Sequence, residues 1–208
     1  RFFTFQYYIK QKAFIFMGIT TEEFFENVYR VIFSPKSFFE QKDIKISLRL
    51  AVGLIAAIAS INKITTGILE GTIKDGFFII FLIGSIIGSL FLWFLTGLFF
   101  EYIAKIFDRG GNLAKILFYT AFAPIPFIFF APLNLIKNIG DWGYLLSVNL
   151  EVILYLWVII LYAFSLRAAY KISLSRSFMM IFLPFISSFF AVYWIIGFCT
   201  KLWYIFSI

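Results

Sequence analysis

Three long stretches of the chain contain no charged residue. They cover residues 76–100, 116–136 and 177–200, which are 25, 21 and 24 residues long. At about 1.5 Å per helical residue, each can cross a hydrocarbon core of about 30 Å. Hydrophobic residues make up 62% of the chain, more than a water-soluble domain of 208 residues can bury. The sequence therefore predicts an integral membrane protein.

Two further apolar stretches are interrupted by polar residues. Residues 46–69 contain Arg49 near one end and Lys63 toward the other, where both side chains can reach the headgroups. Residues 144–166 contain one charge, Glu151. We therefore predict an all-α, polytopic bundle of five transmembrane helices, with four as the alternative.

The basic residues predict an orientation. If the N-terminus is cytoplasmic, 14 of the 18 Lys and Arg residues lie inside, and Lys63, Lys74, Lys137 and Lys201 lie outside. We therefore expect a multi-pass protein of the cell membrane with its C-terminus outside. The net charge of +7 then fits loops beside anionic lipid. We expect contact with the lipid bilayer and no binding of nucleic acid, because the basic residues are scattered over short loops.

The chain divides into three parts in this interpretation. Residues 1–19 form an N-terminal extension without the features of a signal peptide, and one hypothesis places the natural start at Met17. Mass spectrometry of the natural N-terminus tests that hypothesis. Residues 20–43 form amphipathic interfacial helices, and residues 46–208 form the transmembrane bundle.

The segment 20–43 begins with a helix that has two unlike faces. Thr20 and Glu23 have the spacing of a capping box. Phe24, Val28 and Ile32 then recur every four residues and form an apolar stripe.

A serine-proline pair follows this helix. Proline disfavours helix at Ser34, and serine before Pro35 suits the start of a second helix that contains Phe38 and Phe39. We predict a cytoplasmic elbow that lies along the membrane surface before the chain enters the bilayer. Two interpretations are open, an anchor that sets the angle of the first span and a surface that binds a protein.

The layout resembles a known family. Residues 33–40, FSPKSFFE, precede a span, and residues 108–127, DRGGNLAKILFYTAFAPIPF, lead from a double glycine into a proline-bearing span. This pattern resembles the Yip family of Ypt/Rab-GTPase-interacting membrane proteins, in its compact prokaryotic form, over residues 20–208. The resemblance implies five transmembrane helices and a cytoplasmic N-terminus. In eukaryotic members it implies vesicle trafficking and GTPase recruitment, although the family's Asp-Leu-Tyr-Gly-Pro stretch is absent from this sequence.

Two groups of residues mark the loop before the third span and that span itself. Gly110 and Gly111 permit a tight reversal, with Asn112 as the cap of the next helix, whereas the full pattern of a phosphate-binding loop is missing. Pro124, Pro126 and Pro132 remove backbone donors within the span. Thr120, Asn134 or a neighbouring helix would then supply partners for the freed carbonyls, in either a kinked packing helix or a broken helix that lines a site.

Two features of other spans complete the candidates. Glu151 lies within the fourth span, where a carboxylate faces the interface, a hydrogen-bonding partner or a proton- or cation-linked site. Gly84 and Gly88 form a small-residue pattern that we assign to packing within the bundle ahead of dimerisation.

The sequence contains no pattern of an enzyme. It has no histidine, and its one cysteine, Cys199, lies in an apolar stretch. We expect no cofactor and no bound metal. The leading hypothesis is a non-enzymatic protein that organises membrane or recruits a membrane or cytoplasmic protein. A small transporter that uses the proline-broken span and Glu151 is the alternative, and a lipid-modifying enzyme ranks last.

Overall fold

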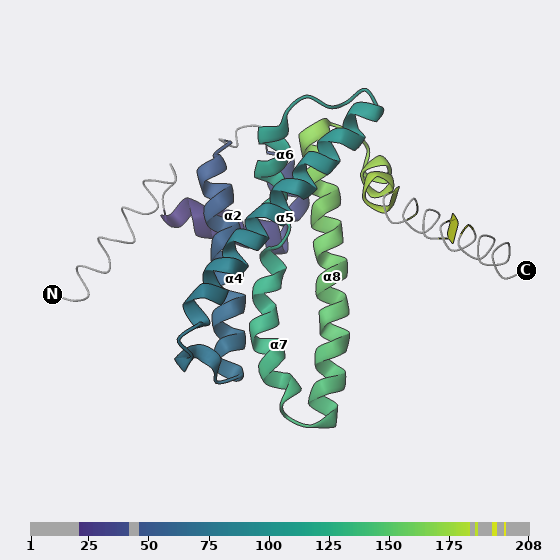
Figure 1. Cartoon of the computed structure of the whole chain (residues 1–208). Helices are drawn as coiled ribbons and strands as arrows, with labels where there is room; N and C mark the ends of the chain where they lie inside the picture. Colours follow the sequence, from purple (N-terminus) through teal and green to yellow (C-terminus); the bar gives the residue numbers. More distant parts are fainter. Residues whose placement is uncertain (1–20, 42–45, 184–185, 187–192, 195–197, 199–208) are drawn as a thin grey trace, which may run out of the picture.

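The computed structural model describes residues 21–41, 46–183, 186, 193–194 and 198 (Figure 1). The regular elements of this part are all helical, which confirms the predicted all-α class. They are α2 (Thr21–Phe33), α3 (Pro35–Phe39), α4 (Leu48–Leu69), η1 (Thr72–Lys74), α5 (Phe78–Ile106), α6 (Leu113–Thr120), η2 (Ile125–Phe129), α7 (Phe130–Lys137) and α8 (Asp141–Tyr170).

Within the described residues, four helical segments are apolar and long enough to cross a membrane. They are Leu48–Leu69, Phe78–Ile106, Leu113–Lys137 and Asp141–Tyr170. A shorter apolar helix, Leu174–Leu183, overlaps the start of the predicted fifth span. Most of that span, the extension at 1–19, Thr20 of the capping box and Cys199 lie outside the described residues.

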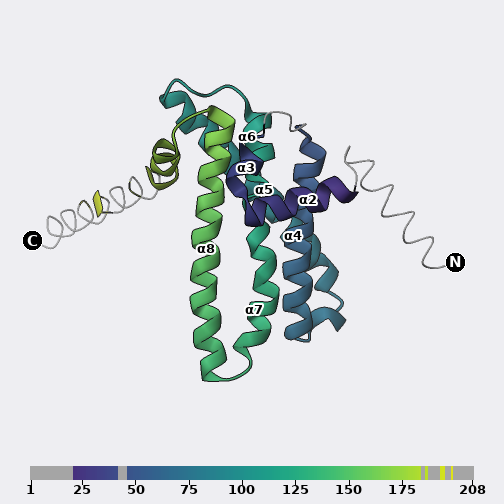
Figure 2. The ribbon, with the colours of Figure 1, turned by 180° about the vertical axis from the view of Figure 1, so that it is seen from behind.

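The spanning segments pack in a definite order. α4 contacts α5, α6 contacts both α5 and α8, and α7 contacts α8 (Figure 1). α2 lies across these helices at a steep angle, as seen from behind in Figure 2. The main core joins side chains from α2, α3, α4, α6 and α8, and a second core joins α5, α6 and α8. The bundle is therefore held together where α6 and α8 meet the N-terminal helices.

The second and fourth spans are longer than their charge-free stretches. α5 continues past Phe100 through Glu101 and Lys105 to Ile106, and α8 begins at Asp141 and ends at Tyr170. α5 therefore extends beyond residue 100, and α8 extends beyond residues 144–166 at both ends. A charge ends a hydrophobic stretch in the sequence, but it does not end a helix whose backbone hydrogen bonds continue.

The third span is broken at its prolines. α6 ends at Thr120, and a 3-10 segment with Pro126 in its first turn precedes α7. The freed carbonyl of Thr120 accepts the Ala123 N–H at 3.3 Å, and that of Phe122 accepts the Ile125 N–H at 3.3 Å. Backbone donors thus take the role expected of Thr120 and Asn134 side chains, because tightening the turn brings an N–H within reach.

A neighbouring helix also contributes to the break. The Ser165 hydroxyl of α8 donates to the Tyr119 carbonyl at 3.1 Å, in a buried contact. The Thr120 hydroxyl instead donates to the carbonyl of Ile116 at 2.8 Å, within its own helix. One buried serine therefore adds a donor to a carbonyl that also accepts the Phe122 N–H at 3.3 Å.

α5 presents most of its length outward. Large apolar side chains such as Ile79, Ile80 and Phe81 are exposed, as expected for a surface in contact with lipid chains. No described atom lies within 4 Å of a Cβ built on Gly84 or Gly88. The packing expected for this small-residue pattern is therefore not found within the described part of the bundle.

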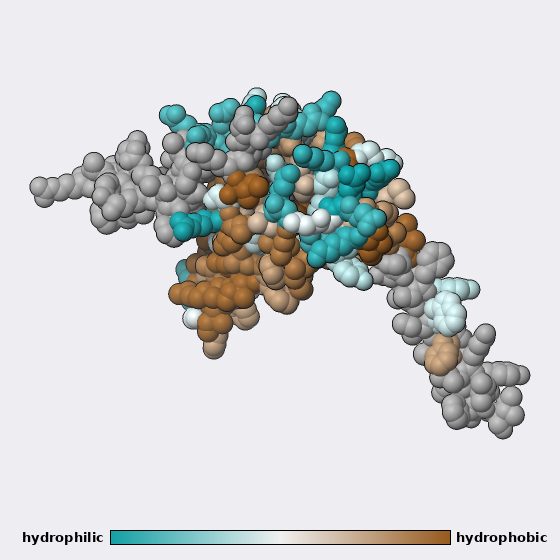
Figure 3. Space-filling model, turned by 90° about the horizontal axis from the view of Figure 1, so that it is seen from above, coloured by the Kyte–Doolittle hydropathy of each residue, from teal (hydrophilic) through white to brown (hydrophobic). Residues whose placement is uncertain are grey.

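The two ends of the bundle differ in charge. Of the twelve Lys and Arg residues in the described part, nine lie at the end that carries α3, the α5–α6 connection and the end of α8. Lys63, Lys74 and Lys137 lie at the opposite end. Figure 3 shows hydrophilic residues gathered over the first of these ends, which we call the basic end.

Candidate functional site

The elbow forms where the sequence predicted it. The Ser34 N–H donates to the Arg30 carbonyl at 2.8 Å at the end of α2, and Pro35 occupies the first position of α3. The Ser37 hydroxyl donates to the Ser34 carbonyl at 2.8 Å. Proline ends one helix here and begins the next, because its ring fixes φ and its missing N–H is not needed in a first turn.

The two phenylalanines of the elbow are buried in the bundle. Phe38 is 0% exposed, and its ring centroid lies 4.9 Å from that of Phe122. Phe39 is 3% exposed and stacks on Phe164 of α8 at 6.4 Å. α3 is therefore a packing element of the core, and its two aromatic side chains face the bundle.

Polar contacts secure the end of the elbow. The carboxylate of Glu40 lies 2.9 Å from the guanidinium of Arg167 in the last turn of α8. The Arg30 side chain donates to the Gln41 side chain at 2.9 Å. The elbow is thus joined to both α2 and α8 outside its buried aromatic pair.

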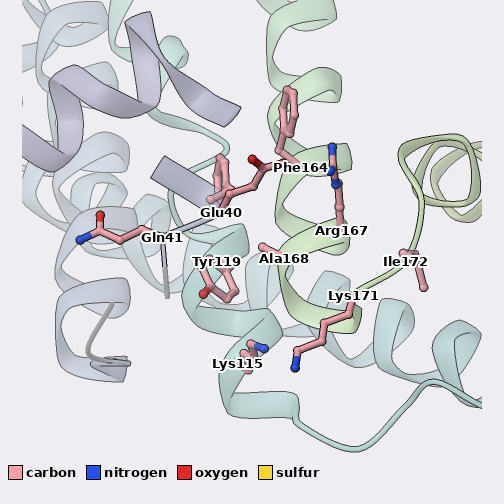
Figure 4. A pocket seen from close by; sticks show the side chains of 10 residues that line it. Glu40, Gln41, Lys115, Tyr119, Phe164, Arg167, Ala168, Lys171 and Ile172 are labelled. Carbon is pink, nitrogen blue, oxygen red and sulfur yellow. Dashed lines mark ion pairs between the residues drawn. The ribbon is translucent and has the colours of Figure 1, made fainter. Parts of the chain in front are cut away.

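A cavity of about 590 Å³ opens beside these contacts. Its lining comes from the end of the elbow, from α6 and from the end of α8 (Figure 4). Three of the lining side chains are cationic, namely Lys115, Arg167 and Lys171, and Glu40 is the single acidic one. The structure therefore forms a basic cavity from residues that are up to 133 positions apart in the sequence.

A buried carboxylate lies near the same end and was not among the predicted residues. Glu101 is 6% exposed, and it accepts hydrogen bonds from the Tyr170 hydroxyl at 2.8 Å and from the Gly111 N–H. Gly97, Glu101 and Ala104 are all buried on one face of α5. In the sequence, Glu101 lies on the same helical face as the small residues Gly97 and Ala104, and this pattern could have indicated a buried carboxylate.

The double glycine shapes the connection that reaches this carboxylate. Gly111 has φ of +137°, which an L side chain rarely adopts, and a Cβ on Gly110 would overlap Lys105. Asn112 caps α6 as predicted, because its side chain accepts the Lys115 N–H at 2.9 Å. The turn thus directs the Gly111 N–H at Glu101.

The remaining candidates lie away from the basic end. Glu151 forms an ion pair with Lys137 of α7, and the Ser147 hydroxyl donates to it at 3.4 Å. Both charged side chains are partly exposed. Asn134 is half-buried in α7, one turn before Lys137. The structure therefore separates Glu151 and Asn134 from the elbow, with Pro124 and Pro126 between the two groups.

These observations define the class of the protein. Four apolar helical segments of spanning length, with a basic end and an opposite end, make a multi-pass α-helical membrane protein. A family model described as the Yip1 domain matches residues 29–195, so the chain belongs to the Yip1 domain family. The resemblance predicted from residues 33–40 and 108–127 is thereby confirmed. No curated protein and no solved structure matches the chain.

Proposed function

We propose that this Yip1 domain protein is non-enzymatic and recruits a protein to the membrane through the outer face of α2. The observation that carries the proposal is the division of this helix into two apolar faces. Phe24, Val28 and Ile32 pack against the core, and Val31 is 0% exposed. The adjacent edge of the helix presents a second row of aromatic residues, which is exposed.

That second row is the proposed contact surface. Phe25, Tyr29 and Phe33 are exposed by 60%, 61% and 68%, at a spacing of four residues. The rings of Tyr29 and Phe33 lie 4.7 Å apart. Aromatic side chains are enriched at the centres of protein interfaces, where they bury large areas with few rotatable bonds. Because the core fixes α2, this row is already ordered before binding.

The charge of α2 favours a protein over the lipid surface. Helices that bind anionic membranes carry Lys and Arg on their polar face. The polar residues of α2 include Glu22, Glu23 and Glu26, with Arg30 as the single cation of the helix. An acidic helix is repelled by anionic lipid, so a protein with a basic surface is the better fit.

We place the basic end, and α2 with it, in the cytoplasm of a cell-membrane protein. The nine basic residues at that end against three at the other support this orientation under the positive-inside rule. The transporter alternative gains no support, because Glu151 is already in an ion pair with Lys137.

Photo-crosslinking from α2 tests the proposal. A photo-reactive residue at Tyr29 should capture a recurrent protein in intact cells, whereas the same group at buried Phe38 should capture none. Capture from Tyr29 should fall sharply in the Phe25→Ser/Phe33→Ser variant and in the Glu22→Lys/Glu26→Lys variant. If Tyr29 captures lipid alone, or if neither variant changes the capture, the recruitment role is wrong.

A further inference from the structure

Among the described residues, the cavity at the basic end is lined by more positive than negative side chains. Arg167 is paired with Glu40 at 2.9 Å. In the part of the chain that the structure describes, no carboxylate lies within ion-pair distance of Lys115 or Lys171. The Lys115 ammonium lies over the face of the Tyr119 ring, 6.0 Å from its centroid. Two ammonium groups therefore remain available to an anion.

The two lysines come from different helices and share one space. Figure 4 shows Lys115 of α6 and Lys171, just after α8, extending toward the same part of the cavity. Like charges at close range repel each other, and the repulsion is relieved when an anion lies between them. An anion with several oxygens suits such a pair, because each ammonium supplies three donors.

The helix dipole favours a cation at Lys171 but disfavours one at Lys115. A cation is favourable at the C-terminal end of a helix, where Lys171 lies. Lys115 lies in the first turn of α6, where the dipole is positive and a cation is unfavourable. The positive helix end and both ammonium groups add to one field in the cavity, which an anion would stabilise.

The backbone at Lys171 adds a second observation. This lysine ends α8 in the left-handed region, with φ of 53°. Glycine or asparagine usually occupies that position, because a Cβ is sterically unfavourable there. The chain thus carries a strained lysine at the rim of the cavity where a relaxed glycine would end the helix equally well.

The surroundings of the cavity fit an amphiphile. One part of its wall is apolar, from Phe39, Phe164 and Ile172. α6 and α8 both belong to spanning segments, and the cavity lies where they end, at the level expected for lipid headgroups. Its volume of about 590 Å³ lies within the range of ligand sites, roughly 300–1,000 Å³.

We propose that this cavity binds a phosphate group, carried by the headgroup of an anionic phospholipid. Lys115 and Lys171 would contact the phosphate oxygens, and the Glu40–Arg167 pair would hold the elbow against α8 as one wall. Basic pockets between transmembrane helices are suited to anionic headgroups. The site is independent of the proposed contact surface on α2.

Native mass spectrometry of the full chain tests the proposal. The chain would be released from mixed micelles that contain equal amounts of phosphatidylglycerol and phosphatidylcholine, and the retained lipids would be counted. We expect preferential retention of one phosphatidylglycerol. The Lys115→Gln/Lys171→Gln variant should bind it about 30-fold more weakly, from the usual contribution of two lysines near a membrane surface. The Lys115→Arg/Lys171→Arg variant should retain it.

A matched variant separates the cavity from the general charge of this end. Lys36→Gln/Lys105→Gln removes the same charge from exposed positions that do not line the cavity, and it should retain the lipid. Equal retention of the two lipids by the unchanged protein, or equal loss in both glutamine variants, would overturn the proposal.

Inorganic phosphate and glycerol 3-phosphate distinguish the source of the phosphate group. In pure phosphatidylcholine, millimolar concentrations of either should raise the unfolding temperature less than phosphatidylglycerol does. If they raise it as much, the phosphate comes from a soluble ligand and the lipid assignment is wrong. Unfolding of each variant in phosphatidylcholine alone shows whether it is folded.

Discussion

The hydroxyl of Tyr170, the last residue of α8, donates a hydrogen bond of 2.8 Å to the buried carboxylate of Glu101 in α5. The Gly111 N–H donates to the other carboxylate oxygen. The Glu101 side chain therefore connects α5, α8 and the turn between α5 and α6. Buried polar groups require such partners, because an unpaired one loses its hydration without compensation.

Removing this hydroxyl should weaken the fold. We expect Tyr170→Phe to lower the free energy of unfolding by about 1–3 kcal/mol, because a charged or polar acceptor loses a buried donor. Titration with sodium dodecyl sulfate, monitored by circular dichroism, measures this. Tyr102→Phe is the control, since Tyr102 is 67% exposed on the same helix. Equal effects of the two substitutions would mean that the Glu101 hydrogen bond contributes little.

The elbow should be required for stability. Phe38→Ala removes a ring that is 0% exposed, and we expect a loss of about 3–5 kcal/mol from the cavity that it leaves. Phe33→Ala, five residues earlier and 68% exposed, should change the free energy of unfolding by less than about 0.5 kcal/mol. The same titration compares the two. Similar values would show that α3 is not held in the core.

Two helical glycines should respond oppositely to alanine. A Cβ on Gly143 would overlap the backbone carbonyl of Ile136 at the α7–α8 turn, whereas a Cβ on Gly84 would meet open space. We expect Gly143→Ala to destabilise the protein by about 1–3 kcal/mol, because a backbone atom must move. Gly84→Ala should be neutral or stabilising by up to about 1 kcal/mol from helix propensity. Equal changes in unfolding would refute the close approach at Gly143.

The Lys137–Glu151 ion pair should contribute to stability as a pair. Glu151→Gln leaves the Lys137 ammonium without its carboxylate, and we expect a loss of roughly 1–2 kcal/mol, between exposed and buried pairs. Lys137→Gln should cost a similar amount. The double substitution should cost less than the two single changes together, which a double-mutant cycle measures. Additive losses would indicate that the two charges do not interact.

The orientation can be tested with single cysteines. With Cys199 replaced by serine, Gly76→Cys should react with a membrane-impermeant maleimide added to intact cells, and Asn112→Cys should react only after the membrane is opened. These positions lie at opposite ends of the bundle. Labelling of Asn112→Cys in intact cells would place the basic end outside.

Local patterns predicted the helices well, for reasons that act over a few residues. Apolar length required spanning helices, Ser34-Pro35 broke the N-terminal helix, and Asn112 capped α6. α5 and α8 extend beyond the predicted spans 76–100 and 144–166, because a charged residue such as Glu101 can continue a helix when a partner elsewhere satisfies it. Residues 33–40 and 108–127 also indicated the family, and both segments lie within the matched range.

The sites depended on contacts that no local pattern contains. Phe38 and Phe39 read as surface residues of an interfacial helix, yet they are buried because α6 and α8 offer aromatic partners. In the sequence, Glu151 was an isolated carboxylate, but in the structure it forms an ion pair with Lys137 of α7. Lys115 and Lys171 were counted only as loop charges, although they line one cavity.

The sequence by itself determined that this chain is a helical membrane protein of the Yip1 domain family, because apolar length, proline and capping residues act locally. Only the tertiary structure decided which apolar side chains face the core, which charges are paired and which ammonium groups share the basic cavity. Those outcomes depend on distances between residues far apart in the chain, such as Glu40 and Arg167, and packing alone sets them.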